Sequence, residues 1–357
     1  MKISLCTVSM NRAHHIKQTL EKNIIDNQDY PDIEFILLDY NSKDDLEYYV
    51  KNSLNKYIKS KKLKYYKTCT PDYFNRSHSR NLAFKLATGD VICNVDADNF
   101  TGAGFAFFLN NIFSQNKNKF YYANEQFDVI GRIAVMKDSF YNIGGFDERM
   151  AYYGFEDSDF MHRLLKSGLT AGLIKETRFL SALSHSNKDR MANEYVVNNY
   201  YKIFLCYLSP SLSILSIFFK NNTFYEGTVV NRLNTNINEP EISSGLHQYD
   251  YTIKEDNWLH GRWKEGEQSY TLLYDNGDTK TLKNSSVLNV FHLVSTQFKY
   301  YEVTENRLIE EALFFYSQLT NRIMFEKNLA SDDYKVNNNA FGNDIVYKNF
   351  SPKAISI

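Results

Sequence analysis

The sequence predicts an α/β fold in which a doubly wound, mostly parallel sheet with flanking helices is followed by a smaller C-terminal α+β region. Over the first 100 residues, short β-branched runs alternate with helical patterns, which is typical of βαβ units. Past residue 220 the pattern changes to that of antiparallel strands. The 357 residues fit about two domains of roughly 150 residues or more. We therefore expect domains at residues 1–215 and 216–357.

Strand and helix patterns follow one another regularly in the first domain. Strands are predicted at 2–9, 33–40, 62–68 and 90–98, and helices at 13–25, 46–58 and 79–87. Ligands of such sheets bind beyond the carboxyl ends of the strands. Polar residues occupy these ends, namely Ser9, Asn11, Arg12, Asp39, Ser42, Asp96 and Asp98. We expect their side chains to converge on one cleft.

The C-terminal region combines hairpin and helix patterns. Strand-like segments span 249–263 and 269–283, and Asn276-Gly277 is a strong two-residue hairpin signal. Residues 302–327 show helical periodicity. The last 30 residues, rich in Asn and Lys, are expected to be loosely ordered.

Composition narrows the range of partners. A formal net charge of −1 gives no electrostatic reason to expect nucleic acid. The four cysteines lack metal-ligand spacing, and the first apolar run is too short for a signal peptide, so a cytoplasmic protein is expected. The apolar run 203–219 contains Pro210 and four serines, which makes it a poor membrane span; a surface helix that contacts a membrane or a partner is the alternative. The lysine-rich stretch 51–67 is either a solvated face or a contact with anionic lipid at the inner face of the membrane.

Two motifs point to a nucleotide diphosphate. Asp96-Ala97-Asp98 follows a buried strand pattern, and hard carboxylate oxygens suit Mg²⁺ or Mn²⁺ shared with phosphate. The same D-x-D pattern recurs at Asp157-Ser158-Asp159, so the place of the first motif, and not its pattern, favours it. Arg76 and Arg80 begin a helix just before it, where cations and helix amides favour an anion.

Four segments occur in the order found in GT-A glycosyltransferases: "SMNRAHHIKQTL", "FNRSHSRNLAFKLATGDVICNVDAD", "GRIAVMKDSFYNIGGFDERMAYYGFEDSDF" and "HSNKDR". They resemble family 2 enzymes, and the later segments are similar to the β-1,4-galactosyltransferase family. The resemblance covers roughly residues 1 to 200. It implies that Asp96 and Asp98 form the metal and nucleotide motif, with Asp98 the more direct ligand, and that His185 completes the site, for which Mn²⁺ is favoured over calcium.

The resemblance also implies roles for two acids. Asp157 corresponds to the general base and Glu156 to the residue that orients the acceptor. The UDP-sugar would lie with uracil near Ser9 and Asp39, and with its diphosphate on the metal and Arg76 or Arg80. Tyr152, Tyr153 and Phe155 replace family tryptophans and a glycine, Ser158 replaces an acid, and Val129 stands near a position that is often aromatic in galactose-specific members, which leaves acceptor and donor open.

The expected function is an inverting, metal-dependent transfer of a hexose or N-acetylhexosamine from a UDP-sugar to a hydroxyl of an oligosaccharide or lipid-linked glycan, in bacterial surface polysaccharide synthesis. The C-terminal region would be accessory, for acceptor binding or for homo-oligomer formation. The alternative is a noncatalytic glycan-binding or assembly subunit, with Trp258 and Trp263 among the sugar-stacking candidates. A nucleotidyltransferase is a third option, but the Gly-rich phosphate loop it usually carries near the first strand is missing from "SMNRAHH".

Overall fold

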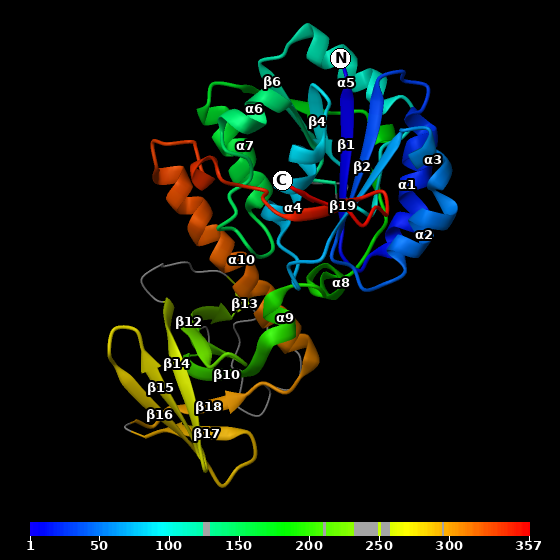
Figure 1. Cartoon of the computed structure of the whole chain (residues 1–357). Coiled ribbons are helices and arrows are strands. Elements are labelled where there is room, and N and C mark those ends of the chain that lie inside the picture. Colours follow the sequence, from blue (N-terminus) through cyan, green and yellow to red (C-terminus); the bar gives the residue numbers. More distant parts are fainter. Residues whose placement is uncertain (124–128, 210–211, 232–248, 251–257, 295) are drawn as a thin grey trace. The chain divides into compact units, whose positions relative to one another are not determined.

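The computed structural model describes residues 1–123, 129–209, 212–231, 249–250, 258–294 and 296–357, which form two compact units (Figure 1). Unit 1 consists of residues 1–186 and 324–357, and unit 2 of residues 187–323. The boundary between the units lies after residue 186, before the boundary expected after residue 215. The chain returns to unit 1 at residue 324.

Unit 1 is built on one nine-stranded sheet in the order β20-β19-β3-β2-β1-β4-β7-β6-β8. Its centre, β3-β2-β1-β4, is parallel, and antiparallel pairs flank it. Both faces of the central strands are covered, which fits their nearly continuous apolar sequences. The strands are β1 (Ile3–Ser9), β2 (Ile33–Tyr40), β3 (Leu63–Thr68), β4 (Val91–Asn94), β6 (Lys119–Ala123), β7 (Ile133–Met136), β8 (Thr170–Ile174), β19 (Ile345–Lys348) and β20 (Ala354–Ser356).

Helices pack on both faces of this sheet, as the doubly wound pattern predicts (Figure 1). One core cluster joins the sheet to α1 (Ala13–Asn27), α2 (Leu46–Ser53), α3 (Asn55–Lys59) and α5 (Phe105–Gln115). The other cluster joins it to α4 (Arg76–Leu86), α6 (Lys137–Asn142) and α7 (Glu156–Lys166). The helix predicted at 46–58 is divided at Leu54 into α2 and α3.

The C-terminal residues are ordered, contrary to the expectation from their composition. β19 pairs antiparallel with β3, and β20 pairs with β19, so both extend the unit 1 sheet. Val346 and Phe341 are buried in one of its cores. This edge pairing supplies the stability that such short strands lack alone.

Unit 2 is an antiparallel sheet in the order β11-β10-β18-β17-β16-β15-β14-β12-β13, and β11 also pairs with β12, so that the sheet closes on itself. Its strands are β10 (Tyr200–Ser209), β11 (Leu212–Phe219), β12 (Thr223–Asn231), β13 (Tyr249–Asp250), β14 (Trp258–Gly266), β15 (Ser269–Tyr274), β16 (Thr279–Asn284), β17 (Val290–Leu293) and β18 (Lys299–Glu302). The predicted hairpin at Asn276-Gly277 joins β15 to β16. Of the strand pattern predicted at 249–263, residues 251–257 lie outside the described residues.

Aromatic side chains fill the interior of the closed sheet. Trp263 is buried there, its indole N–H donates to the Phe219 carbonyl at 3.0 Å, and its ring stacks on Tyr201. Trp263 is therefore excluded from the sugar-stacking candidates, because its ring is occupied by core contacts.

The apolar segment 203–219 falls in β10 and β11, which pair with each other, so the surface helix considered as an alternative for this segment is not formed. Buried strands and buried helices share continuous apolar sequences, and periodicity does not separate them. Pro210 itself lies outside the described residues. Within the described ranges, no helix is both long enough and apolar enough to cross a membrane.

The remaining elements are short, apart from one long helix. β5 (Asn99–Phe100) pairs with β9 (Ser181–Ala182), and α8 (Asn187–Met191) and α9 (Tyr195–Asn199) begin unit 2. Helix α10 (Asn306–Ala330) matches the helical pattern predicted at 302–327. Single 3₁₀ turns occupy Thr177–Phe179 and Asn337–Asn339.

Candidate active site

Two loops at the carboxyl ends of β1 and β2 are joined by hydrogen bonds. The Asn11 amide donates to Ser42 Oγ at 3.0 Å, and Asn11 Oδ1 accepts from the Lys43 amide at 2.6 Å. Asn11 takes a positive φ of 53°, a region that asparagine tolerates better than most residues. The residues predicted beyond these strands therefore do lie together.

Asp39 is fully buried at the end of β2. Its Oδ1 accepts from the Ser42 amide at 2.9 Å and its Oδ2 from the Tyr65 hydroxyl at 2.6 Å. Burial raises the pKa of Asp39, although both hydrogen bonds oppose the change. Nearby, Ser9 Oγ is buried and has no hydrogen-bond partner among the described residues.

Arg12 and Arg76 stand at the starts of two helices. Arg12 immediately precedes α1, and its carbonyl accepts from the His15 and Ile16 amides. Arg76 is the first residue of α4 and is largely buried; its guanidinium lies over the rings of Phe74, at 5.3 Å, and Tyr153, at 4.5 Å.

Arg80, one turn further along α4, joins three carboxylates from distant parts of the chain. Its Nη1 donates to Asp157 Oδ1 at 2.8 Å and to Glu156 Oε1 at 3.2 Å, and its Nη2 donates to Asp96 Oδ1 at 3.3 Å. All three acids thus meet at one guanidinium, which links the D-A-D motif to the E-D motif.

The charges of this cluster shift one another's proton affinities. Burial raises the pKa of Asp157 to about 7; Arg80 opposes this, while Glu156 and Asp96 reinforce it. Burial also favours the protonated form of Asp96, but Arg80 and the Asn94 amide outweigh it and lower the pKa of Asp96. Burial disfavours the charged form of Arg80, yet the three carboxylates outweigh burial and raise its pKa.

Asp98 and His185 form a separate pair. The antiparallel pairing of β5 with β9, extended by the Leu183 amide donating to the Asp98 carbonyl at 2.8 Å, brings the two loops together. His185 Nε2 then lies 2.6 Å from Asp98 Oδ2, and Asp98 Oδ1 accepts from the Asn99 side chain at 3.1 Å. Within the described part of the chain, no group of three or more His, Cys, Asp or Glu is placed to hold a metal ion, and Asp96 is engaged with Arg80 instead.

Three further residues belong to this region but were not singled out from the sequence. The His15 ring lies 5.2 Å from the His185 ring, and burial, aided by His14, lowers the pKa of His15 to about 4, so it is neutral at pH 7. Arg132 is fully buried, and its Nη2 donates to Asn99 Oδ1 at 3.1 Å. A Cβ atom at Gly131 would collide with Asp96 and Arg80, so only glycine admits their approach. The His14-His15 pair after the first strand was the available signal for His15.

Several buried polar atoms in this region have no hydrogen-bond partner among the described residues. Such atoms are uncommon in folded proteins and call for an explanation, of which a ligand is one. They are Ser9 Oγ, His15 Nδ1, Arg132 Nε and Nη1, Glu156 Oε2 and His185 Nδ1.

Two family models match successive parts of unit 1. Residues 4–103 match the model described as glycosyl transferase family 2, and residues 112–186 match the model described as the N-terminal domain of galactosyltransferase. The matches confirm the resemblance carried by the motifs and, with the helix-flanked sheet, the expected GT-A α/β class.

Solved structures include similar chains at low identity. The crystal structure of S. aureus TarS 1–349 in complex with UDP is 15% identical, with a TM-score of 0.44, over 53% of this chain and 62% of that chain. The mannosyltransferase PcManGT from Pyrobaculum calidifontis in complex with GDP-Man and Mn²⁺ is 18% identical, with a TM-score of 0.42, over 49% of this chain and 55% of that chain. Both alignments span less than two thirds of the solved chain. No curated protein matches the sequence.

Proposed function

We propose that the protein is an inverting, metal-dependent glycosyltransferase that moves a hexose or N-acetylhexosamine from a UDP-sugar to a hydroxyl of a glycan. The observation that carries this proposal is the ion-pair cluster in which Arg80 joins Asp96 to Glu156 and Asp157. It sets the nucleotide motif beside the acceptor motif, as transfer between two substrates requires. The product belongs to bacterial surface polysaccharide synthesis in this proposal.

The Asp98–His185 pair offers an oxygen and a nitrogen donor that suit Mn²⁺ or Mg²⁺, with phosphate oxygens completing the coordination. When bound, the metal would stabilise negative charge on the UDP leaving group. Ser9, Asn11 and Asp39 would bind the nucleoside beyond β1 and β2. Arg12 and Arg76 lie at helix starts, where they would favour the diphosphate.

Asp157 is the proposed general base. The acceptor hydroxyl attacks the anomeric carbon as the bond from that carbon to the UDP oxygen breaks, and its proton passes to Asp157. Attack from the face opposite UDP inverts the anomeric centre. Glu156, whose Oε2 is buried and has no partner among the described residues, is left with one oxygen to orient the acceptor.

Replacement of Asp157 by Asn tests the base. Proton abstraction by a positioned carboxylate contributes about 10²- to 10⁴-fold, so D157N should lose turnover by about that factor while binding UDP normally in calorimetry. Asp138→Asn, which changes an exposed aspartate on the first turn of α6, is the control for the substitution itself. Near-normal turnover of D157N would show that the base is another residue.

A donor screen separates the enzyme from a noncatalytic binding subunit. UDP-glucose, UDP-galactose and their N-acetyl forms are incubated with and without Mn²⁺, and UDP release is measured. We expect release with one donor, abolished by chelation. No release from any donor in the presence of Mn²⁺ would favour the binding subunit.

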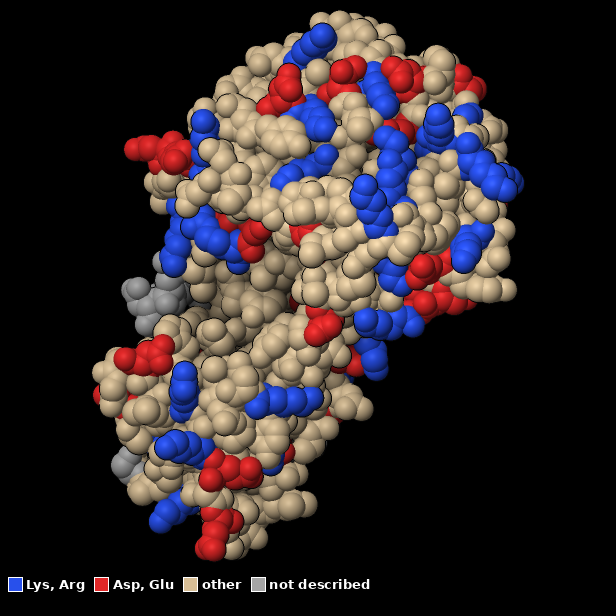
Figure 2. Space-filling view, in the orientation of Figure 1, with Lys and Arg blue, Asp and Glu red and all other residues tan. Residues whose placement is uncertain are grey.

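The membrane alternative rests on the lysine-rich stretch 51–67. Figure 2 shows basic and acidic side chains interspersed on the visible face of unit 1. Within the stretch, Lys56, Lys64 and Lys67 form ion pairs with Glu21, Glu34 and Glu47. This pairing favours a solvated face over a contact with anionic lipid.

A further inference from the structure

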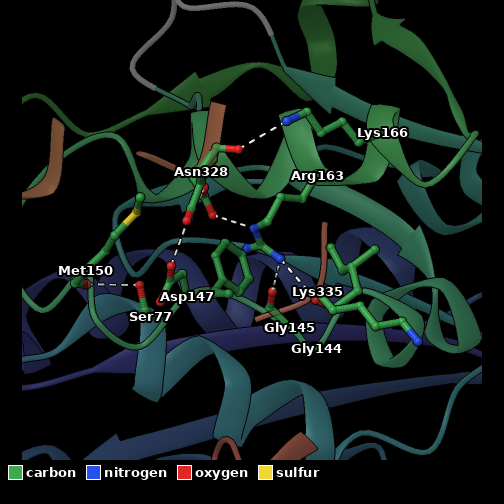
Figure 3. A network of polar contacts seen from close by, with 12 residues as sticks. Ser77, Gly144, Gly145, Asp147, Met150, Arg163, Lys166, Asn328 and Lys335 are labelled. Carbon is green, nitrogen blue, oxygen red and sulfur yellow. Dashed lines mark hydrogen bonds and ion pairs between the residues drawn. The ribbon is translucent and has the colours of Figure 1, made fainter. Parts of the chain in front are cut away.

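Helix α7, which begins with Glu156 and Asp157, is held at both ends by one segment of the chain that returns to unit 1. We name residues 324–331 the return segment. At the far end of α7, Lys166 Nζ donates to the Asn328 carbonyl at 3.1 Å (Figure 3). It also donates to the carbonyls of Leu329 and Ser331 at 2.9 and 2.5 Å. A cation at the C-terminus of α10 is also favoured by the helix dipole.

At the first turn of α7, the contact is made by Asn328. Its side-chain amide donates to Asp147 Oδ2 at 2.8 Å (Figure 3) and to Asp159 Oδ1 at 2.7 Å. Its Oδ1 accepts from Arg149 Nη2 at 2.9 Å. The residue is buried, so every polar atom of its side chain is engaged inside the protein. Asn328 therefore ties the loop before α7 to the helix itself.

Arg163 completes the attachment from within α7. Its Nε donates to Asp159 Oδ2 at 2.7 Å in a wholly buried ion pair, and its Nη1 donates to the carbonyls of Ile143 and Gly145 (Figure 3). Asp159 thus has one oxygen on Arg163 and the other on Asn328. Neither contact is made by Glu156 or Asp157, which leaves those two acids to the Arg80 cluster.

The residue that turns the chain into α7 also meets the return segment. Phe155 has a φ of 67°, which is strained for a side chain of this size. Its ring stacks on Phe325 with centroids 5.8 Å apart, and its carbonyl accepts from the Asp159 amide at 2.8 Å. A strained backbone conformation persists only where surrounding contacts hold it in place, and such conformations are enriched at functional sites.

We propose that Asn328 is a positioning residue that fixes the first turn of α7, and so sets Glu156 and Asp157 against Arg80. This rests on the proposed function, in which Asp157 is the base. A displacement of about 1 Å at a catalytic group is enough to reduce rate about 10²-fold. Loss of Asn328 removes the donor that Asp147 and Asp159 share, so the first turn of α7 loses this link to the loop before it and the Asp159 carboxylate is held by Arg163 alone.

The test compares Asn328→Ala with Asn27→Ala in the full chain. Asn27 is a matched control because it also ends a helix, is buried, and bonds on both sides, to Thr101 Oγ1 and the Ala106 amide. Measurements are kcat, KM for the donor, melting temperature, and hydrogen exchange of the peptide spanning 155–163. We expect both variants to melt earlier. Only N328A should lose kcat, about tenfold or more, with KM within about twofold and faster exchange in that peptide.

Equal kcat in N328A and N27A would overturn the positioning role, as would slow exchange of the α7 peptide in N328A. If N328A does not fold, Phe325→Leu replaces it, because that variant keeps the hydrogen bonds of Asn328 and loosens the contacts of the return segment with the rings of Phe155 and His162. A kcat for F325L equal to that of N27A would show that the return segment does not position the first turn of α7, and the role of Asn328 would fall with it. Full turnover by D157N would instead remove the proposed base, which distinguishes the two failures.

Discussion

Arg80 makes its ion pairs with residues 16, 76 and 77 positions away along the chain. The sequence places it at a helix start, where an anionic ligand would be its natural partner, and the family resemblance places Asp157 in the acceptor motif. Neither indicates that the two side chains meet. A buried arginine among three acids explains how two carboxylates remain close without both taking up protons.

Asp157 gives the protein a pH dependence that a surface aspartate would not. Because its pKa is raised from 3.8 to about 7, the carboxyl holds a proton below that pH and cannot accept another from the acceptor. We expect kcat/KM to rise as the pH increases through about 7 and then to level. D157N should show a flat profile over the same range. A wild-type profile without an acidic limb would contradict this assignment.

Gly131 limits how the cluster is assembled. Alanine there must push Asp96 and Arg80 aside, so we expect turnover of G131A to fall about tenfold or more, with a smaller change in melting temperature. Gly266→Ala is the control, because only Ser269 stands near that position. Wild-type turnover in G131A would mean that the Arg80–Asp96 contact is dispensable.

Among the elements, helices α4 and α7, which are about 70 residues apart in the sequence, supply charged side chains of the site. Helix α4 carries Arg80 and begins with Asn75 as its cap, whose Oδ1 accepts from the His78 amide at 3.0 Å. Helix α7 carries the acids and is fixed by the return segment. The positions of Arg80, Glu156 and Asp157 therefore depend on how firmly the first turns of these two helices are held.

The α4 cap makes a measurable contribution to stability. Asn75→Ala should reduce the free energy of unfolding by about 1 kcal/mol, since one helix amide loses its acceptor. Asn75→Asp keeps a carboxylate oxygen in that place and should be close to wild type. Chemical denaturation of both variants measures the difference, and equal losses would show that the cap bond is not the cause.

At the scale of the whole molecule, unit 1 is discontinuous, because residues 187–323 separate its two parts. A chain ending at residue 323 lacks Asn328, β19 and β20. We expect unit 1 of this chain to give no cooperative transition in calorimetry, because Asp147 and Asp159 lose their shared donor and β3 loses its pairing with β19. A chain ending at residue 353, which lacks exposed β20 and the half-buried Ile357, should still melt sharply. A sharp transition of unit 1 in the shorter chain would show that residues 324–357 are unnecessary for its folding.

The sequence was a good guide where strong local patterns decide the structure. The first three strands and their helices were predicted because apolar runs such as 33–40 are long and punctuated. The strands at residues 203–219 were not predicted, and a surface helix was left open, because a continuous apolar run fits a buried strand or a helix equally well. β19 escaped notice because its stability comes from pairing with β3, far away in the sequence. His185 beside Asp98 was reached through the resemblance alone, since nothing local distinguishes one histidine.

The return of the chain to unit 1 has a consequence for its synthesis. On the ribosome, the residues of β3 emerge long before those of β19, so until the end of translation β3 presents an edge of unpaired backbone groups. Asp147 and Asp159 likewise lack their shared hydrogen-bond donor until Asn328 has been synthesised. A nascent chain stalled within unit 2 would carry every sequence motif of the proposed enzyme and still lack the segment that sets its acids in place.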